Sequence, residues 1–297
     1  MKCPVCLSQR LEVHVDSPLD REYFVARQCH SSYFRCLECE SLSLEPRPTA
    51  EETGTFYTAG YQNYSKTSAP LIGTLFAQLQ QLSLKGFKSR FPVSSRVLDY
   101  GCNQGQFLKL LQQNGYQDLY GYDVVPLEAG ANTGFAFYHD LQALLATGQK
   151  FDVIRMNHVI EHLPDVDSNM RLLAALLSDR GIIIGQTPNA DHFTTRFFKS
   201  YWGGLHFPYH LTLFSPQSLA AAAARWGLWA RPTRPTIVPT GWCMSFENIF
   251  KLRLFKKVSG RSPIYILFVL ASAPFVLFDR LRGKTAIIDY EFEKVMP

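Results

Sequence analysis

The chain has 297 residues, of which 46% are hydrophobic and 19% are charged, and its formal net charge is +5. This length suits one large domain with a small appendage or two modest domains, and the composition excludes a disordered chain. The mild charge gives no strong reason to expect nucleic-acid binding. The first residues, Met1 to Cys6, lack the apolar core of a signal peptide, which predicts a cytosolic protein whose seven cysteines are reduced.

Two Cys-x-x-Cys pairs stand near the N-terminus: Cys3 with Cys6, and Cys36 with Cys39. Four thiolates at this spacing can close a tetrahedral zinc site, and the metal then stabilises a segment that has little core of its own. The pattern predicts a zinc ribbon over 1–45, with strands at Leu11–Val15 and Tyr23–Val25. Because four cysteines leave no open coordination position, we assign the zinc a structural role. Cys29 and His30 form a spare pair that can substitute for a ligand.

The central stretch of the chain is an apolar strand at Val97–Tyr100 that runs into a turn and then into a helix from Gln106. Gly101 and Gly105 permit positive φ and close approach of a ligand. Two ligand classes use such a turn, dinucleotides and S-adenosylmethionine (SAM). The dinucleotide fingerprint needs glycine at its first, third and sixth positions, and Asn103 and Gln106 occupy the last two of these.

The stretch instead resembles the first motif of class I SAM-dependent methyltransferases, Asp-x-Gly-x-Gly-x-Gly, which reads here Asp99, Gly101, Asn103, Gly105. Asparagine adopts positive φ more readily than most residues, so the turn can survive the change at its middle position. The resemblance implies an α/β fold over 94–297, a Rossmann-like seven-stranded sheet with helices on both faces. It also implies that Tyr100 and Cys102, in the same turn, belong to the cofactor site.

Residues 46–93 are expected to be a connector and helical cover, with an amphipathic helix at Leu71–Phe87. In class I methyltransferases the segment before the first strand often packs over the cofactor, and Tyr57, Tyr61 and Tyr64 are available for that. Ordinary surface aromatics in a linker are the alternative.

Two further carboxylates follow predicted strands. Leu119–Asp123 predicts a second strand, and Asp123 lies 24 positions after Asp99, where a carboxylate can accept hydrogen bonds from both ribose hydroxyls. A third strand at Phe135–Tyr138 leads to Asp140, which the resemblance places near the adenine. The alternative is that Asp140 caps the following helix, and both roles can hold.

A fourth strand, Phe151–Met156, leads into a second motif that begins at Asn157. It resembles the His-Val-x-Glu-His-Leu-Pro-Asp run of many class I methyltransferases, including the O-methyltransferases of ubiquinone biosynthesis. The resemblance implies that Asn157 or His158 lies beside the sulfonium, with Glu161 and His162 at the floor of the pocket. In the ubiquinone enzymes a similar Glu-x-x-Glu-His set is associated with a divalent metal, and the corresponding residues here are His158, Glu161 and His162. The alternative is that Glu161 and His162 hydrogen-bond to the backbone and orient the loop.

A helix over Asp165–Ser178 and a fifth strand over Gly181–Gln186 precede an insertion, residues 190–214, that is dense in aromatics and imidazoles. We interpret the insertion as an acceptor-binding lid, because aromatic faces stack on flat or sugar rings and a neutral histidine can take up a proton. His210 is the first choice as general base. The alternative is a structural histidine that caps the next helix.

Near the C-terminus, Ile264–Phe278 is a run of 15 residues without a charge. It is shorter than the roughly 20 residues needed to span a bilayer, and basic residues lie on both sides of it within 251–284. The segment (262–279 with its margins) predicts either peripheral contact with the inner face of a membrane or a buried helix. Thr285–Phe292 predicts the last strand, antiparallel at the sheet edge.

Together these motifs predict a SAM-dependent methyltransferase with an N-terminal zinc ribbon, acting by O-methylation on a saccharide or other small metabolite, including a lipid-linked one. Some sugar methyltransferases of antibiotic pathways resemble this chain in pairing a cysteine-rich zinc module with this fold. The alternatives are C-methylation of a nucleotide sugar and a zinc-ribbon nucleic-acid-binding protein with a non-catalytic methyltransferase-like domain. The ribbon carries no dense basic cluster, which argues against the last.

Overall fold

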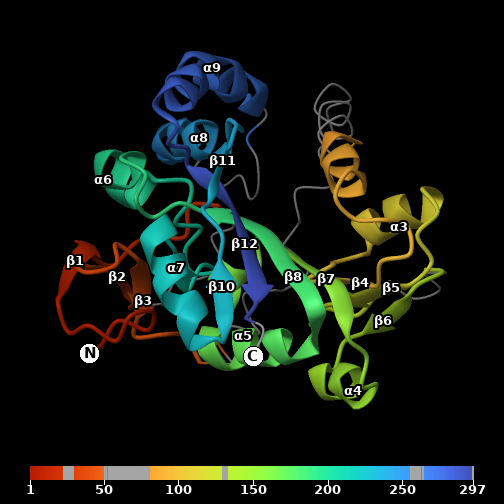
Figure 1. Ribbon diagram of the computed structural model, residues 1–297. Helices are drawn as coiled ribbons and strands as arrows, with labels where there is room; N and C mark the ends of the chain where they lie inside the picture. The colour runs from red at the N-terminus through yellow and green to blue at the C-terminus, as the bar shows by residue number, and fades with distance from the viewer. Residues whose placement is uncertain are drawn as a thin grey trace.

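A mixed β-sheet runs through the centre of the protein (Figure 1). The structure is a computed structural model and describes residues 1–22, 30–49, 52, 81–128, 133–254, 262 and 264–295. The strand order is β10-β12-β8-β7-β4-β5-β6, and β11 also pairs with β12. The predicted Rossmann-like methyltransferase sheet is therefore confirmed, with one short strand added.

The parallel part of the sheet contributes side chains to core clusters on both of its faces. It consists of β4 (Val97–Tyr100), β5 (Leu119–Tyr122), β6 (Ala136–Tyr138), β7 (Phe151–Asn157) and β8 (Leu177–Pro188). Successive side chains of a strand point to opposite faces, so Val97 and Val153 enter one core cluster while Leu98 and Ile154 enter another. Helices cover both faces: α3 (Gln106–Gln113), α4 (Leu141–Ala146), α5 (Val166–Leu176) and α7 (Pro216–Arg225) (Figure 1).

The last strand, β12 (Ile287–Lys294), is antiparallel to β8, as predicted. Its predicted place at the sheet edge is wrong, because β10 (Leu228–Ala230) and β11 (Arg234–Thr236) pair with its other side. Both of these strands have three residues, too few for an alternating pattern to show in the sequence.

The N-terminal residues form a second sheet of β1 (Leu11–Val15), β2 (Ser32–Cys36), β3 (Leu42–Glu45) and β9 (Thr212–Leu213). The first of these is the strand predicted at Leu11–Val15. β9 belongs to the insertion 190–214, so this insertion and the N-terminal segment share one sheet. They also share a core, in which Tyr33 and Leu42 pack with Trp202, Leu205 and Phe207. The insertion also holds α6 (Thr194–Phe198) and the 3-10 turn η2 (Lys199–Tyr201).

Several predictions concern residues outside the described ranges. These are the strand at Tyr23–Val25, the substitute ligand Cys29, and the three connector tyrosines Tyr57, Tyr61 and Tyr64. Of the helix predicted at Leu71–Phe87, residues 81–88 are described, and they are helical.

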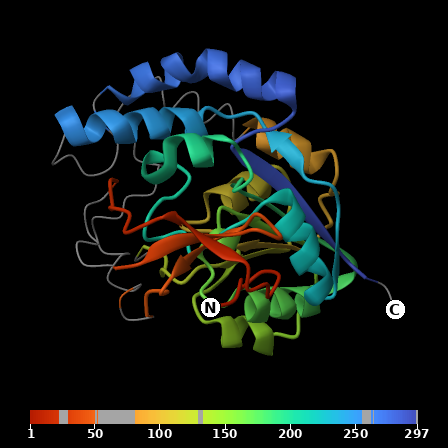
Figure 2. The ribbon, with the colours of Figure 1, turned by 90° about the vertical axis from the view of Figure 1, so that its left-hand side faces the viewer.

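Two long helices form the outermost layer, α8 (Thr240–Leu254) and α9 (Tyr265–Arg282) (Figure 2). α9 contains the charge-free run from Tyr265 onward, with Ile264 as its N-cap, and is the outer helix of the pair. Among the described residues, no helix combines the length and apolarity needed to cross a bilayer.

Candidate active site

The turn between β4 and α3 has the backbone geometry that its residues predict. Gly101, Asn103 and Gly105 have φ values of 81°, 52° and 70°. A Cβ atom added to Gly101 would lie 2.4 Å from Val159 Cγ2, and one added to Gly105 would lie 2.2 Å from Phe135 Cζ. Glycine is therefore required at both positions for the backbone angle and for close side-chain packing.

Asp123 closes this turn from the carboxyl end of β5. Its Oδ2 accepts the Asn103 N–H at 2.7 Å and its Oδ1 accepts the Val125 N–H at 2.9 Å. Burial raises the pKa of Asp123, and the two backbone N–H groups partly offset this rise. Each oxygen has a second lone pair, so the carboxylate can accept further hydrogen bonds from a diol beside the turn. This donor and acceptor set fits the ribose of SAM.

Asp99 and Arg155 form an ion pair that the sequence analysis missed. Arg155 Nη1 donates to Asp99 Oδ1 at 2.8 Å, and the guanidinium lies 4.0 Å from the ring centre of Phe107. Asp99 and Arg155 are register partners on the neighbouring strands β4 and β7. The available signal was a cation next to the apolar residues Val153, Ile154 and Met156 of the strand Phe151–Met156, since a charge in a buried strand needs a partner.

The other predicted cofactor residues surround the same turn. Tyr100 is buried, donates its hydroxyl to Asn169 Oδ1 at 3.0 Å and stacks on Tyr122. Burial raises the pKa of the buried Cys102 thiol. Asp140 caps α4 by accepting the backbone N–H of Gln142 at 2.9 Å, so the capping alternative is confirmed. Asn157 ends β7, half-buried, at the carboxyl edge of the sheet.

The four residues predicted to be catalytic come together around Glu161, which lies in the 3-10 turn η1 (Ile160–His162). Glu161 is fully buried. Its Oε2 accepts the Thr187 hydroxyl at 3.0 Å, and its Oε1 lies 3.3 Å from His158 Nδ1 and 3.9 Å from His210 Nε2. His162 belongs to the same turn, and its ring centre lies 4.6 Å from that of His210.

Backbone carbonyls fix two of the imidazoles. His162 Nδ1 donates to Tyr209 O at 3.0 Å, and His210 Nδ1 donates to Gly204 O at 2.8 Å. The predicted alternative in which His210 caps the next helix is wrong, because Ser215 caps α7. Leu211 N–H also donates to Glu161 O at 2.8 Å, so the insertion is bonded directly to η1.

His158 is placed differently from the other two histidines. Its side chain is 47% exposed, whereas that of His210 is 9% exposed. Its φ of 55° is rare for a residue with a side chain, and its N–H donates to Gln186 O at 2.8 Å. Residues held in such a conformation concentrate at functional sites.

Burial sets the protonation states in this cluster. Burial raises the pKa of Glu161, but the hydrogen bond from His158 and the nearby imidazoles outweigh it and leave this pKa below its usual value. Burial lowers the pKa of His162 to about 4, with Glu161 opposing the shift. Burial and the neighbouring His162 and His206 lower the pKa of His210 well below its usual value. At neutral pH the cluster therefore holds one carboxylate and two neutral imidazoles.

Comparison with known proteins identifies the family. The methyltransferase domain family matches residues 71–230, which is 160 of the 297 residues. The chain belongs to the methyltransferase domain family. It is a class I SAM-dependent methyltransferase. None of the curated proteins compared with this methyltransferase matches it.

Solved structures similar to this methyltransferase match it at low sequence identity. A SAM-dependent methyltransferase from Archaeoglobus fulgidus is 17% identical, with a TM-score of 0.48, and the match covers 73% of this chain and 94% of that one. The magnesium protoporphyrin IX methyltransferase of Synechocystis with bound SAH is 16% identical, with a TM-score of 0.46, over 78% and 91% of the two chains. Coclaurine N-methyltransferase is 13% identical, with a TM-score of 0.47, over 79% and 76%. At these scores the likenesses carry no argument about the acceptor.

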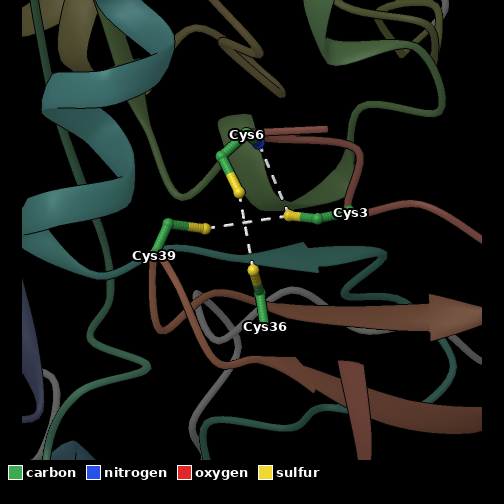
Figure 3. Close-up of side chains that lie close together, drawn as sticks. All are labelled: Cys3, Cys6, Cys36 and Cys39. Atoms are coloured by element: carbon green, nitrogen blue, oxygen red, sulfur yellow. Dashed lines mark hydrogen bonds between the residues drawn. The ribbon is translucent and has the colours of Figure 1, made fainter. Parts of the chain in front are cut away.

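The methyltransferase also brings the four N-terminal cysteines together. Their sulfur atoms lie within 4.8 Å of one another and point to a common centre (Figure 3). The Cys3 and Cys39 sulfurs are 3.7 Å apart, and the Cys6 and Cys36 sulfurs are 3.5 Å apart. This donor set fits one tetrahedral Zn²⁺. In the described residues, a second group, Glu161, His162 and His210, also places ligand atoms within 4.8 Å of one another.

Aromatic side chains of the insertion are largely buried. Trp202 and Tyr209 are 1% and 3% exposed and His206 is 7% exposed, so these side chains pack inside the protein. His206 stacks on Tyr209, and its Nδ1 lies 3.1 Å from Glu22 Oε2. The insertion is therefore packed firmly over η1, and its role as an acceptor lid stays a prediction.

Proposed function

We propose that this methyltransferase methylates a hydroxyl oxygen of a saccharide or another small metabolite, and that His158 takes up the hydroxyl proton. The observation that carries this proposal is the pairing of a half-exposed imidazole with a fully buried carboxylate, His158 with Glu161, at the carboxyl end of β7. Ligands of open α/β sheets bind at this edge.

The cofactor side of the reaction rests on the β4 to α3 turn. Residues Asp99 to Gly105, with Asp123, Asp140 and Asn157, would hold SAM, which supplies an electrophilic methyl group when bound. The chain then has to align the acceptor and remove its proton. Alignment alone can lower the barrier by about 7–11 kcal/mol at best.

Glu161 sets the tautomer of His158. An ionised carboxylate only accepts hydrogen bonds, so His158 Nδ1 carries the hydrogen of the 3.3 Å contact. His158 Nε2 is then left with its lone pair and can accept the acceptor's hydroxyl proton. The imidazolium that results is stabilised by the negative charge of Glu161. General-base assistance of this kind contributes about 10²–10⁴-fold to rate.

His210 and His162 support this pair. The sequence favours His210 as the base, but its imidazole faces inward and its lowered pKa makes it a weak proton acceptor. We propose that His210 and His162 are positioning residues that hold η1 and Glu161 in place through the insertion.

The acceptor class is supported by the two sequence motifs and by the pairing of a cysteine module with this fold. A C-methyltransferase acting on a nucleotide sugar is the nearest alternative. Incubation with deuterium-methyl SAM and a panel of saccharides and nucleotide sugars tests both. We expect a gain of one labelled methyl group at an oxygen, located by NMR. A labelled methyl on carbon would favour the alternative and overturn O-methylation.

One observation favours a second account, in which a divalent cation assists at the same site. The lone pair of His210 Nε2 faces Glu161 Oε1 at 3.9 Å, and a cation between them would stabilise both. Elemental analysis separates the accounts. The proton-acceptor account predicts one metal ion per chain, a zinc ion held by the four cysteines, and no metal lost in Glu161→Gln. Two ions per chain, with the second lost in Glu161→Gln, would favour the cation.

The cytosolic location and the contact with the inner face of a membrane are further predictions. The membrane contact involves the surface of α9 and not the chemistry of the site.

A further inference from the structure

The outer face of α9 exposes apolar side chains that most helices bury. Its inner side packs on α8, where Tyr265 and Phe268 are buried with Cys243 and Met244. Its outer side presents residues that are each at least 46% exposed: Leu267, Leu270, Leu277, Phe278 and Leu281. We call these five residues the α9 face. It lies on the outermost helix of the molecule (Figure 2).

The charges of α9 are sorted between its two sides. Asp279 is the only acidic residue of the helix, and it is 4% exposed. It is held inward because its Oδ2 accepts Trp242 Nε1–H at 2.7 Å and its Oδ1 lies 3.2 Å from His192 Nε2. Arg280 and Arg282 are exposed at the C-terminal end of the helix. The outer side therefore combines apolar groups with positive charge alone.

The α9 face adjoins the insertion that packs over the catalytic cluster. The ring centre of Phe193, in the insertion, lies 6.3 Å from that of Phe278. The Arg282 guanidinium lies 5.5 Å from the ring centre of Phe278. A surface that engages α9 thus also lies against the first residues of the insertion.

We propose that the α9 face docks this methyltransferase onto a bilayer that contains anionic phospholipids. Leucine and phenylalanine side chains enter the boundary between headgroups and acyl chains, while Arg280 and Arg282 meet lipid phosphates. Charge complementarity favours this occupant over a second copy of the chain. A second copy offers no acidic group on its own α9 face for the arginines, whereas an anionic bilayer offers many.

Vesicle flotation of the full, zinc-loaded chain tests the docking. We expect binding to phosphatidylcholine vesicles that contain phosphatidylglycerol and weaker binding to pure phosphatidylcholine. The double variant Leu270→Asn with Leu277→Asn should lower the partition coefficient about tenfold or more, because two apolar side chains no longer leave water. Arg280→Gln should lower it about fivefold through the lost charge. The matched control Val13→Asn, at a residue 58% exposed on β1, should bind as the wild type does.

SAM titration of each variant controls for misfolding, and it requires no knowledge of the methyl acceptor. An unchanged SAM affinity shows that the altered helix leaves the core intact. If the double variant fails to fold, Arg280→Gln carries the test alone. Equal flotation of wild type, Arg280→Gln and the double variant would overturn the proposal. A second result would also overturn it: the wild type forms a dimer in solution that does not bind vesicles, and the α9 substitutions dissociate this dimer. The occupant of the α9 face would then be a second copy of the chain.

Discussion

Replacing Glu161 by glutamine tests whether its buried charge is stabilised by its neighbours. The carboxylate accepts a hydroxyl hydrogen bond from Thr187 at 3.0 Å and an imidazole hydrogen bond from His158 at 3.3 Å. Glutamine has almost the same shape, so it fills the same space without a cavity. It removes the charge. Its amide oxygen can accept one of the two hydrogen bonds as a neutral group, and its NH2 group can only donate, so the Thr187 hydroxyl has to turn round and accept.

The size of the effect follows from those two hydrogen bonds. A hydrogen bond to a charged group contributes about 1.5–3 kcal/mol and a neutral one about 0.5–1.5 kcal/mol, so each bond loses about 1 kcal/mol. The lower cost of burying a neutral amide offsets part of this loss. We therefore expect Glu161→Gln to lower the free energy of unfolding by about 1–2 kcal/mol at neutral pH. In a chain of this size, each kcal/mol of unfolding free energy that is lost lowers the Tm by about 2–4 °C.

The pH dependence of stability tests independently whether the Glu161 carboxylate stabilises the fold. Because folding lowers the pKa of Glu161 below its unfolded value of 4.5, its contribution is fully present above that value. The contribution is lost as the pH falls through the folded pKa. Urea unfolding should therefore show a difference between wild type and variant that is largest at neutral pH and shrinks below pH 4.5.

Glu38→Gln is the matched control, because the Glu38 side chain is 47% exposed and pairs with the exposed Arg10. Its unfolding free energy should change by less than about 0.5 kcal/mol. The reasoning is refuted if Glu161→Gln is as stable as the wild type at neutral pH, or if the difference grows as the pH falls.

Three other variants test the site and the zinc cluster. His158→Ala should lower kcat about 100-fold or more in the labelled-methyl assay while SAM affinity stays constant. His210→Ala should retain more activity than His158→Ala. The reverse order of activities would identify His210 as the base. Gly105→Ala should lower the unfolding free energy by about 2 kcal/mol or more in urea, because φ is 70° and Phe135 crowds the new Cβ; wild-type stability would contradict that packing. Cys36→Ser should lose zinc in elemental analysis and lower the Tm, and retention of one zinc per chain would argue against the four-cysteine site.

Local sequence patterns predicted most of the central sheet. The strand before Gly101, the turn with its positive φ values and the helix after it follow from residue types within a dozen positions. The Asp-Tyr-Gly start of the motif was predicted from its resemblance to the methyltransferase family, and Asp123 from its place after the second predicted strand, behind that turn. The apolar run at Ile264–Phe278 forms most of α9, and Tyr265 and Phe268 are buried against α8, whereas contact of this run with a membrane stays a prediction.

Contacts between distant segments could not be predicted in the same way. Nothing near Thr187 shows that its hydroxyl bonds to Glu161, because the contact depends on how η1 packs against β8. The pairing of β9 with β3 involves two residues of β9, which carry no periodic signal. The aromatics of the insertion suggested an acceptor-binding lid, which stays a prediction. Trp202 and Tyr209 are buried, and sequence does not distinguish an aromatic that packs a core from one that contacts a ligand.

The cofactor site at Asp123 is the central claim, and calorimetric titration with SAM and SAH tests it most directly. Asp123→Asn keeps the shape of the side chain but removes the charge, and we expect the Kd for SAM to rise at least about tenfold. The matched control is Asp118→Asn, because Asp118 is partly exposed and paired with Arg96, at the other end of the same strand, and it should leave the Kd unchanged. Micromolar binding that Asp123→Asn weakens at least about tenfold and that Asp118→Asn leaves unchanged is the predicted result. Binding unaffected by Asp123→Asn, or no binding to the folded wild type, would contradict the account.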